Sequence, residues 1–281
     1  MEKSRTRIAI LGAGNIGGAI GKGLVESQLV SADRVTLTRR KAESLEEFSR
    51  LGFSTTSDNA KAIKNSQVLF IAVTPQQLNP LLTEIKKSVD ERHHIIVSLV
   101  SGVTIAELRK HLGRKVPIIR AMPNTAIAIR QSMTCLATES GADGALTLVK
   151  QIFDVLGRTL VISEELMVPA TALCACGIAF FLRAVRAASQ GGIEIGFHAE
   201  DALLMAAQTA LGAAALLVRP GTHPEREVDK VTTPQGCTIS GLNQMEHNGF
   251  SSALIKGIVT SAEKADVLYK PKPKHASQET D

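Results

Sequence analysis

The chain has 281 residues, which is enough for two domains of ordinary size. Apolar residues make up 44% of it and charged residues 21%, which excludes an intrinsically disordered chain. Lys and Arg outnumber Asp and Glu by 32 to 27, an excess that suits a polyanionic ligand and an ordinary surface equally well. No basic stripe is interleaved with aromatic residues, so we expect no nucleic-acid partner.

The cysteine pattern indicates reduced thiols. The four cysteines show no C-x-x-C spacing, which in a chain of this length is typical of a cytosolic protein. Cys174 and Cys176 could hold a metal together with His198, but small buried residues on a helix explain the two cysteines better. We therefore expect no metal site.

Two apolar stretches resemble membrane segments without meeting their requirements. The N-terminal one runs into a glycine-rich turn and has no clean cleavage site, so we expect no signal peptide. Ala202–Val218 is nearly free of charge but is shorter than the roughly 20 residues that a spanning helix needs. A helix that is apolar all round is buried, so we expect this one to lie between subunits of a cytoplasmic protein with no membrane partner.

The stretch Arg7–Gly18 predicts a dinucleotide site. Residues 8–11 form a short apolar run of the kind that makes a strand buried on both faces. Gly12, Gly14 and Gly17 then give G-x-G-x-x-G, and a helix can follow. These glycines allow a tight turn, close approach to a pyrophosphate and close packing of helix on strand. The free N–H groups of the helix would hold the phosphates.

The residues after the next expected strand, Arg34–Thr38, favour NADP(H) over NAD(H). NAD enzymes place an acidic residue here for the ribose 2′-OH, whereas this chain has Thr38, Arg39, Arg40 and Lys41. Arginine binds a 2′-phosphate through charge-assisted hydrogen bonds, and Thr38 can add another. A solvated basic turn is the alternative, and NAD(H) remains possible.

Strands and helices alternate through the first half of the chain, which predicts an α/β fold with a Rossmann-type doubly wound parallel sheet over residues 1–162. Thr104 and Glu107 form a capping box for one of the helices. The loops that follow successive strands should gather at one sheet edge, where such folds bind ligands. The expected strands are Arg34–Thr38, Gln67–Val73, His94–Leu99 and Val116–Arg120 after the first, and the expected helices are Lys41–Arg50, Thr56–Lys64, one from Pro75, and Ile105–His111.

The second half has a different pattern. From about Ser163 strand signals vanish, and Ala- and Leu-rich helices are expected at Val168–Gly191, Ala199–Arg219, Cys237–Asn248 and Phe250–Tyr269. Residues 163–270 thus form an all-helical second domain. The Pro- and Lys-rich tail over residues 271–281 is expected to be disordered.

The stretch Val228–Phe250 resembles the signature of the pyrroline-5-carboxylate reductase family. Asp229, Val231, Thr232, Pro234, Gly236, Thr238, Gly241, Leu242 and Glu246 match that pattern. Further matches follow in the same order along the chain: LGAGNIGGAI, AVTPQ, SGVTI, MPNT and AAQTALGAA. Such collinear agreement is more specific than any single motif.

The resemblance implies that the protein reduces 1-pyrroline-5-carboxylate to L-proline with NADPH or NADH, the last step of proline biosynthesis. It also implies a helical dimerisation domain and a homodimer or larger homo-oligomer. With the glycine motif, it assigns cofactor binding to Gly12, Ala13, Gly14, Asn15, Ile16, Gly17, Thr38, Arg39, Arg40, Asn59, Ala72, Val73, Thr74, Pro75 and Ser101. It assigns substrate binding to Thr233, Gly236, Cys237 and Thr238.

The chemistry of the signature loop agrees with this assignment. A protonated cyclic imine is already an electrophile, so the protein has to position it and bind its carboxylate. Hydroxyls and backbone N–H groups at a helix start suit a carboxylate. Thr238 is the candidate catalytic residue because its hydroxyl can donate and accept a proton. The alternative is a simple N-cap at Thr238, with the proton coming from water.

The sequence departs from the family pattern where the substrate pocket is expected. Family members usually carry Ser-Gly-Ser-Gly-Pro-Ala-Tyr where this chain has Cys174–Phe180, and Gln235 stands in place of the second signature glycine. Reduction of another small imine therefore stays open, as does a deazaflavin-linked NADP oxidoreductase on the same scaffold. A non-enzymatic NADP-binding protein is a further alternative.

Overall fold

The computed structural model describes residues 6–218 and 221–268. The described chain forms two compact units, which are treated separately below: residues 6–175 with 261–268, and residues 176–260. The predicted tail over residues 271–281 lies outside the described residues.

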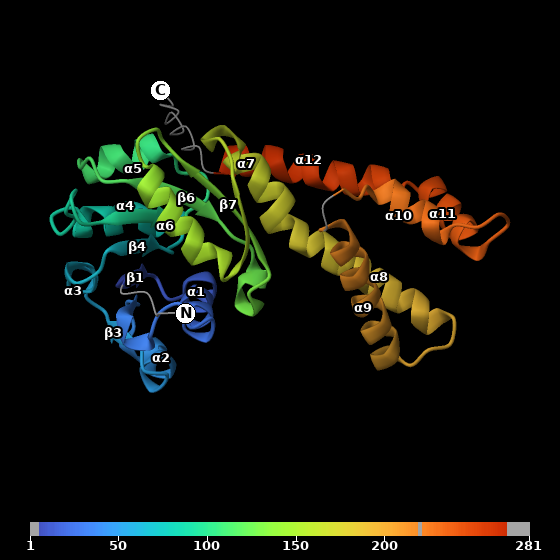
Figure 1. Cartoon of the computed structure of the whole chain (residues 1–281), viewed down its shortest axis with the longest axis horizontal. Helices are drawn as coiled ribbons and strands as arrows, with labels where there is room; N and C mark the ends of the chain where they lie inside the picture. Colours follow the sequence, from blue (N-terminus) through green and yellow to red (C-terminus); the bar gives the residue numbers. More distant parts are fainter. Residues whose placement is uncertain (1–5, 219–220, 269–281) are drawn as a thin grey trace, which may run out of the picture. The chain divides into compact units, whose positions relative to one another are not determined.

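The first unit is built on an eight-stranded sheet in the order β3-β2-β1-β4-β5-β6-β7-β8 (Figure 1). All neighbouring strands are parallel except β6 and β7, which pair antiparallel. The strands are β1 (Ile8–Leu11), β2 (Val35–Thr38), β3 (Ser54–Thr56), β4 (Val68–Ile71), β5 (Ile95–Ser98), β6 (Ile118–Met122), β7 (Ser132–Thr138) and β8 (Gly157–Val161). The predicted Rossmann-type sheet is confirmed, with this one antiparallel pair added.

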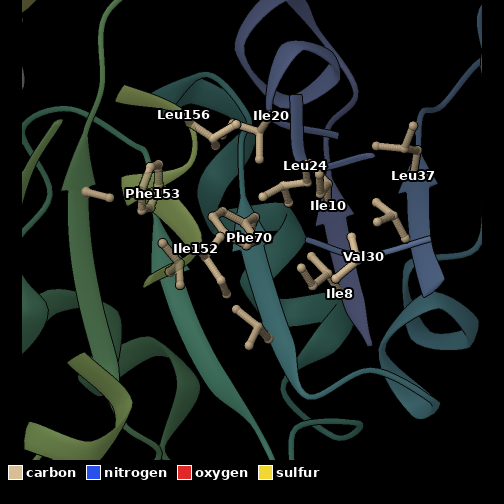
Figure 2. Close-up of a cluster of buried hydrophobic side chains, with 14 of the residues drawn as sticks. Ile8, Ile10, Ile20, Leu24, Val30, Leu37, Phe70, Ile152, Phe153 and Leu156 are labelled. Atoms are coloured by element: carbon tan, nitrogen blue, oxygen red, sulfur yellow. The ribbon is translucent and has the colours of Figure 1, made fainter. Parts of the chain in front are cut away.

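Helices cover both faces of the sheet. They are α1 (Asn15–Glu26), α2 (Glu46–Arg50), α3 (Asn59–Lys64), α4 (Pro75–Ile85), α5 (Ile105–Leu112) and α6 (Asp143–Asp154). Successive residues of β1 point to opposite faces: Ile8 and Ile10 pack with α1 and α6, while Ala9 and Leu11 pack with α3, α4 and α5. The first of these cores is drawn in Figure 2, where Phe70 of β4 meets Phe153 of α6 with ring centroids 5.8 Å apart.

The sequence analysis missed four elements of this unit. It assigned no structure to β7, α6 and β8, and it placed Thr56 in a helix although Thr56 ends β3. β3 has three residues and none of them is buried, so it lacks the apolar run that identifies a strand in a parallel sheet. The capping box of α5 is confirmed, with both of its hydrogen bonds formed.

Residues 163–175 pack with the first unit. They form a short 3₁₀ turn (Glu164–Leu166), α7 (Met167–Ala170) and a π-helical turn (Thr171–Cys176). Met167 and Cys174 join Met122 and Cys135 in a small apolar cluster beside β7. The compact unit therefore continues past the domain boundary expected at residues 162/163.

The second unit is all-helical, as predicted. It comprises α8 (Gly177–Glu194), α9 (Ala199–Leu217), α10 (Pro224–Val231), α11 (Cys237–His247) and most of α12 (Phe250–Leu268). α8 and α9 form a hairpin, in which a Cβ atom added to Gly192 would lie 3.0 Å from the Cβ of Ala202 (Figure 1).

Little of this unit is buried within the chain. Ala202 is the only buried residue of α9, and Leu204 and Leu211 of that helix are 69% and 62% exposed. By length and composition, the segments Glu164–Glu194 and Ala199–Leu217 could cross a membrane, a test that the core helices of many proteins also pass. Large exposed apolar faces typically mark an interface with another protein or with a membrane.

Candidate active site

A cleft of about 700 Å³ opens where β1, β2 and β4 end. Parallel strands place their carboxyl ends at one edge of the sheet, and the change of strand order between β1 and β4 separates their loops there. The cleft is lined by Leu11, Gly12, Gly14, Thr38, Arg39, Arg40, Lys41, Ser44, Ser57, Asn59, Ala72, Val73, Thr74, Gln77 and Leu81.

The three glycines of the loop after β1 differ in what surrounds them. Gly12 has a φ of +107°, and a Cβ atom there would lie 2.6 Å from the carbonyl oxygen of Ala72. A Cβ atom on Gly17 would lie 2.3 Å from the carbonyl oxygen of Gly12, so the helix packs closely on its own loop. Gly14 has no protein atom within 4 Å of that position, which leaves room for a ligand to approach the backbone.

The start of α1 is suited to phosphate. Its N-cap, Gly14, offers no side chain, and the first turn contains no acidic residue. Because they open the helix, the N–H groups of the first turn have no intrahelical acceptor, and no side chain caps them. They present the positive end of the helix dipole to the cleft. The N–H of Ala13 donates to the carbonyl oxygen of Thr38 at 2.8 Å, which fixes this loop against the end of β2.

Three cations follow β2. Arg39, Arg40 and Lys41 are exposed and line the cleft. Across residues 6–218 and 221–268, no carboxylate lies within ion-pair distance of them. The open backbone at Gly14, the unpaired helix start and these free cations together fit a dinucleotide with an additional phosphate on its ribose.

Nine of the residues predicted to bind the cofactor line this cleft: Gly12, Gly14, Thr38, Arg39, Arg40, Asn59, Ala72, Val73 and Thr74. Ala13, Asn15, Ile16 and Gly17 lie in the loop and first turn of α1 beside it, and Pro75 begins α4. Ser101 lies after β5, outside the cleft, with its hydroxyl 3.8 Å from the sulfur of Met122.

The sequence analysis did not assign Leu11, Ser44, Ser57, Gln77 and Leu81 of the cleft to the cofactor, and it named Lys41 only as part of the basic turn. Ser57 follows β3 directly, so recognition of that short strand would have placed it at the ligand edge. Gln77 lies in the first turn of α4 and Leu81 in the second, where no motif marks them.

Glu164 connects three segments of the first unit near this edge. Its carboxylate accepts a hydrogen bond from the backbone N–H of Ile105 at 2.7 Å and from the guanidinium of Arg120 at 3.1 Å. Arg120 lies in β6 and is 3% exposed. Because a buried guanidinium without a partner would be very costly, this ion pair holds the start of α5 against β6. The sequence analysis did not single out either residue.

The signature loop lies between α10 and α11 in the second unit. The N–H of Gly236 donates to the carbonyl oxygen of Thr233 at 2.9 Å, and a Cβ atom on Gly236 would lie 2.6 Å from the Thr233 hydroxyl. Gln235 has a φ of +59°, a conformation that costs a residue other than glycine about 1–2 kcal/mol. The position where the family pattern has glycine therefore still requires a glycine-like backbone in this chain.

Thr238 is the second residue of α11 and is half-buried. The N-cap is Gly236, which makes no side-chain cap, so the alternative that Thr238 is a simple N-cap is wrong. Thr233 and Cys237 are exposed beside it. The first turn of α11 has no acidic residue, and its N–H groups are available to an anion such as a carboxylate.

Cys174, the first residue of the altered Cys174–Phe180 segment, packs against the buried cluster that contains Cys135 of β7. The amide of Asn124 donates a hydrogen bond to the Cys174 carbonyl oxygen at 3.2 Å. Within the described residues, no three His, Cys, Asp or Glu side chains gather in a way that could hold a metal ion.

Comparison with known families decides the relationship. Residues 164–268 match the pyrroline-5-carboxylate reductase dimerisation family, and residues 7–102 match a family described as NADP oxidoreductase, coenzyme F420-dependent. Pyrroline-5-carboxylate reductase 2 of Dictyostelium discoideum is 50% identical over 279 residues, which cover 94% of this chain and 93% of that protein. The chain belongs to the pyrroline-5-carboxylate reductase family.

Other members of the pyrroline-5-carboxylate reductase family agree. Pyrroline-5-carboxylate reductase 1 of Dictyostelium discoideum is 56% identical over 277 residues, and the chain spans 50% of that protein's length. The solved pyrroline-5-carboxylate reductase of Coxiella burnetii matches with a TM-score of 0.88 at 28% identity, over 95% of this chain and all of that one. The Plasmodium falciparum reductase, solved with NADP bound, shares the fold with a TM-score of 0.85 at 20% identity over 95% of this chain and 99% of that one.

The two family matches bear on the alternatives left open by the sequence. The description that mentions coenzyme F420 covers only the dinucleotide-binding part, whereas the helical part matches pyrroline-5-carboxylate reductase dimerisation. The chain is thus an oxidoreductase of the pyrroline-5-carboxylate reductase family with that family's dimerisation region, and a purely non-enzymatic NADP-binding protein is disfavoured.

Proposed function

We propose that this protein reduces 1-pyrroline-5-carboxylate to L-proline, the last step of proline biosynthesis, with NADPH as its cofactor. The observation that carries the proposal is the cleft at the sheet edge, where an open glycine loop, an unpaired helix start and three free cations come together in a member of this reductase family. Bound NADPH supplies the hydride that reduces the C=N bond.

In this proposal Arg39 and Arg40 neutralise the 2′-phosphate, and the backbone from Gly12 to Gly17 accommodates the pyrophosphate. The other cofactor residues assigned from the sequence are proposed to contact the dinucleotide, and Lys41, Ser44 and Ser57 join them because they line the same cleft. NADH is the second cofactor that the cleft accommodates, since the pyrophosphate site serves both dinucleotides equally.

The substrate carboxylate binds the loop from Thr233 to Thr238. The N–H groups of Cys237 and Thr238 at the start of α11 attract the anion, and the Thr238 hydroxyl holds the ring nitrogen or the carboxylate. In this proposal the Thr238 hydroxyl relays to the imine nitrogen, directly or from water, the proton that makes the C=N bond electrophilic. Hydride addition then moves the C=N electron pair onto that nitrogen and gives the amine.

The active form is a homodimer or a larger homo-oligomer in the cytoplasm. The second unit buries almost none of α9, and a matching subunit would cover that apolar face. No nucleic acid or membrane takes part.

The test is an assay with the purified full-length protein. Addition of 1-pyrroline-5-carboxylate should cause loss of NADPH absorbance together with formation of an equal amount of proline. Another small cyclic imine, such as pyrroline-2-carboxylate, serves as the competing substrate. If NADPH binds but only the competing imine is turned over, the proposed substrate is wrong, and the protein is an NADPH-dependent reductase of another imine.

A further inference from the structure

A chain of hydrogen bonds runs from the cofactor cleft to α4 through Thr38, Asn59 and Glu84. The hydroxyl of Thr38 donates to Oδ1 of Asn59 at 2.7 Å. Nδ2 of Asn59 donates to both carboxylate oxygens of Glu84, at 3.1 and 3.2 Å. Thr38 and Asn59 line the cleft, whereas Glu84 is an exposed residue of α4 that does not line it.

The carboxylate fixes the direction of this chain. An ionised carboxylate only accepts hydrogen bonds, so the amide of Asn59 has to turn its NH₂ group toward Glu84. Its carbonyl oxygen then faces Thr38, which has to donate to it. Thr38 has a single O–H proton, and once this proton is committed the hydroxyl can only accept a hydrogen bond from a ligand.

An acceptor at this position distinguishes the two dinucleotides. The ribose 2′-OH of NADH can donate to Thr38, whereas a 2′-phosphate carries only acceptor oxygens and finds no donor there. The expectation that Thr38 helps to bind the phosphate is thus not supported by its hydrogen bonding. The phosphate is left to Arg39 and Arg40, with the negative charge of Glu84 one amide group behind Thr38.

We propose that Glu84 sets the cofactor specificity of this site by orienting Asn59 and keeping Thr38 an acceptor. The inference rests on the proposed use of NADP(H) in this cleft. In NAD enzymes a carboxylate at the end of β2 accepts a hydrogen bond from the ribose 2′-OH. Here Glu84 on α4 acts through Asn59, so that the Thr38 hydroxyl is the acceptor at this position. The site therefore balances cations that favour NADPH against an acceptor that favours NADH, and the protein uses both cofactors.

Glu84→Gln tests this assignment because a neutral amide can both donate and accept a hydrogen bond. Asn59 can then turn its NH₂ group toward Thr38, which leaves the Thr38 hydroxyl free to donate to the phosphate. We expect the ratio of the NADH to the NADPH dissociation constant, measured by fluorescence on the full chain, to rise about tenfold or more, the range for one gained hydrogen bond to a charged group. Glu26→Gln, which removes an exposed carboxylate on α1 outside the cleft, is the matched control and should leave the ratio unchanged.

The same change in a Thr38→Val background separates the hydrogen-bond chain from simple charge removal. Without the hydroxyl there is no donor to release, so Glu84→Gln should no longer shift the ratio. An unchanged ratio in the single variant, or a shift that persists with Val at position 38, would overturn the assignment to Glu84. If the wild type binds neither dinucleotide, the proposed function itself fails, which the binding measurement shows before any variant is compared.

Discussion

Cys135 of β7 and Cys174 pack in one apolar cluster, where each thiol shifts the acidity of the other. The neighbouring Cys135 thiol lowers the pKa of Cys174 to about 7. Interaction with Cys174, together with burial, raises the pKa of Cys135 above its ordinary value. Cys174 is therefore the reactive member of the pair.

Alkylation of Cys174 should follow this acidity. Because the thiolate is the nucleophile, the rate should increase through pH 7 and level off above it, whereas an ordinary thiol reaches its midpoint near pH 8.5. Iodoacetamide labelling read by peptide mass spectrometry across pH 6–9 gives the profile. Cys135→Ala removes the neighbouring thiol that lowers the pKa of Cys174 and should move the midpoint upward. A midpoint that is the same with and without Cys135 would refute the Cys135 thiol as the cause.

Arg39 and Arg40 should decide how well NADPH is used. Replacing them together, as Arg39→Asp with Arg40→Ser, removes two cations with no carboxylate partner among the described residues and introduces repulsion toward the 2′-phosphate. Loss of one charged hydrogen bond costs about 1.5–3 kcal/mol, so the KM for NADPH should rise about tenfold or more. The KM for NADH is the internal control and should change little. An unchanged ratio of the two KM values would contradict the assignment of Arg39 and Arg40 to the 2′-phosphate.

The exposed face of α9 should lie in a subunit interface. Leu211 is 62% exposed within the chain, so Leu211→Glu would disturb little of a lone subunit but would place an unpaired charge in an interface. Sedimentation velocity should show smaller species than for the wild type. Asn79→Glu, which adds the same charge to an exposed position of α4, should leave the assembly intact. A wild type that is a stable monomer would contradict the interface.

Thr238 should affect turnover of the imine and not binding of the cofactor. Thr238→Ala should lower kcat/KM for the imine about tenfold or more, because a positioned proton-transfer group is usually worth 10²–10⁴ in rate. Thr238→Ser keeps the hydroxyl and should restore much of the loss, while NADPH affinity stays constant in both variants. If Thr238→Ala turns over at the wild-type rate, the proton comes from water and Thr238 only lines the loop.

The strands that could be predicted from the sequence are those with an apolar run buried on both faces, above all where a recognisable motif follows the strand. Residues 8–11 are completely buried and lead into the glycine loop, so both the strand and the site after it could be read. β3 and β8 lie at the two edges of the sheet and contain no fully buried residue, and without an apolar run they were missed. β7 is buried but pairs antiparallel, which breaks the alternation from which the other strands were inferred.

The site was only partly predictable for a related reason. Residues at the end of a strand, such as Thr38 and Arg39, could be assigned to the site from the sequence. The carboxyl ends of parallel strands lie at the ligand-binding edge of the sheet, so their position in the chain fixes their position in the fold. Glu84 reaches Asn59 from 25 residues away along the chain, and this proximity depends on how α3 and α4 pack. The same holds for Glu164, which meets Ile105 and Arg120 across the sheet edge.

The most direct test of the central claim follows the hydride itself. NADPH carrying deuterium at C4 of the nicotinamide, on one face or the other, is incubated with the protein and 1-pyrroline-5-carboxylate, and the proline formed is analysed by mass spectrometry and NMR. We expect one of the two labelled cofactors, and not the other, to give proline with a single deuterium at C5, since an enzyme presents one face of the ring. Proline without deuterium from either cofactor, or no proline at all while NADPH is bound, would contradict the proposed function.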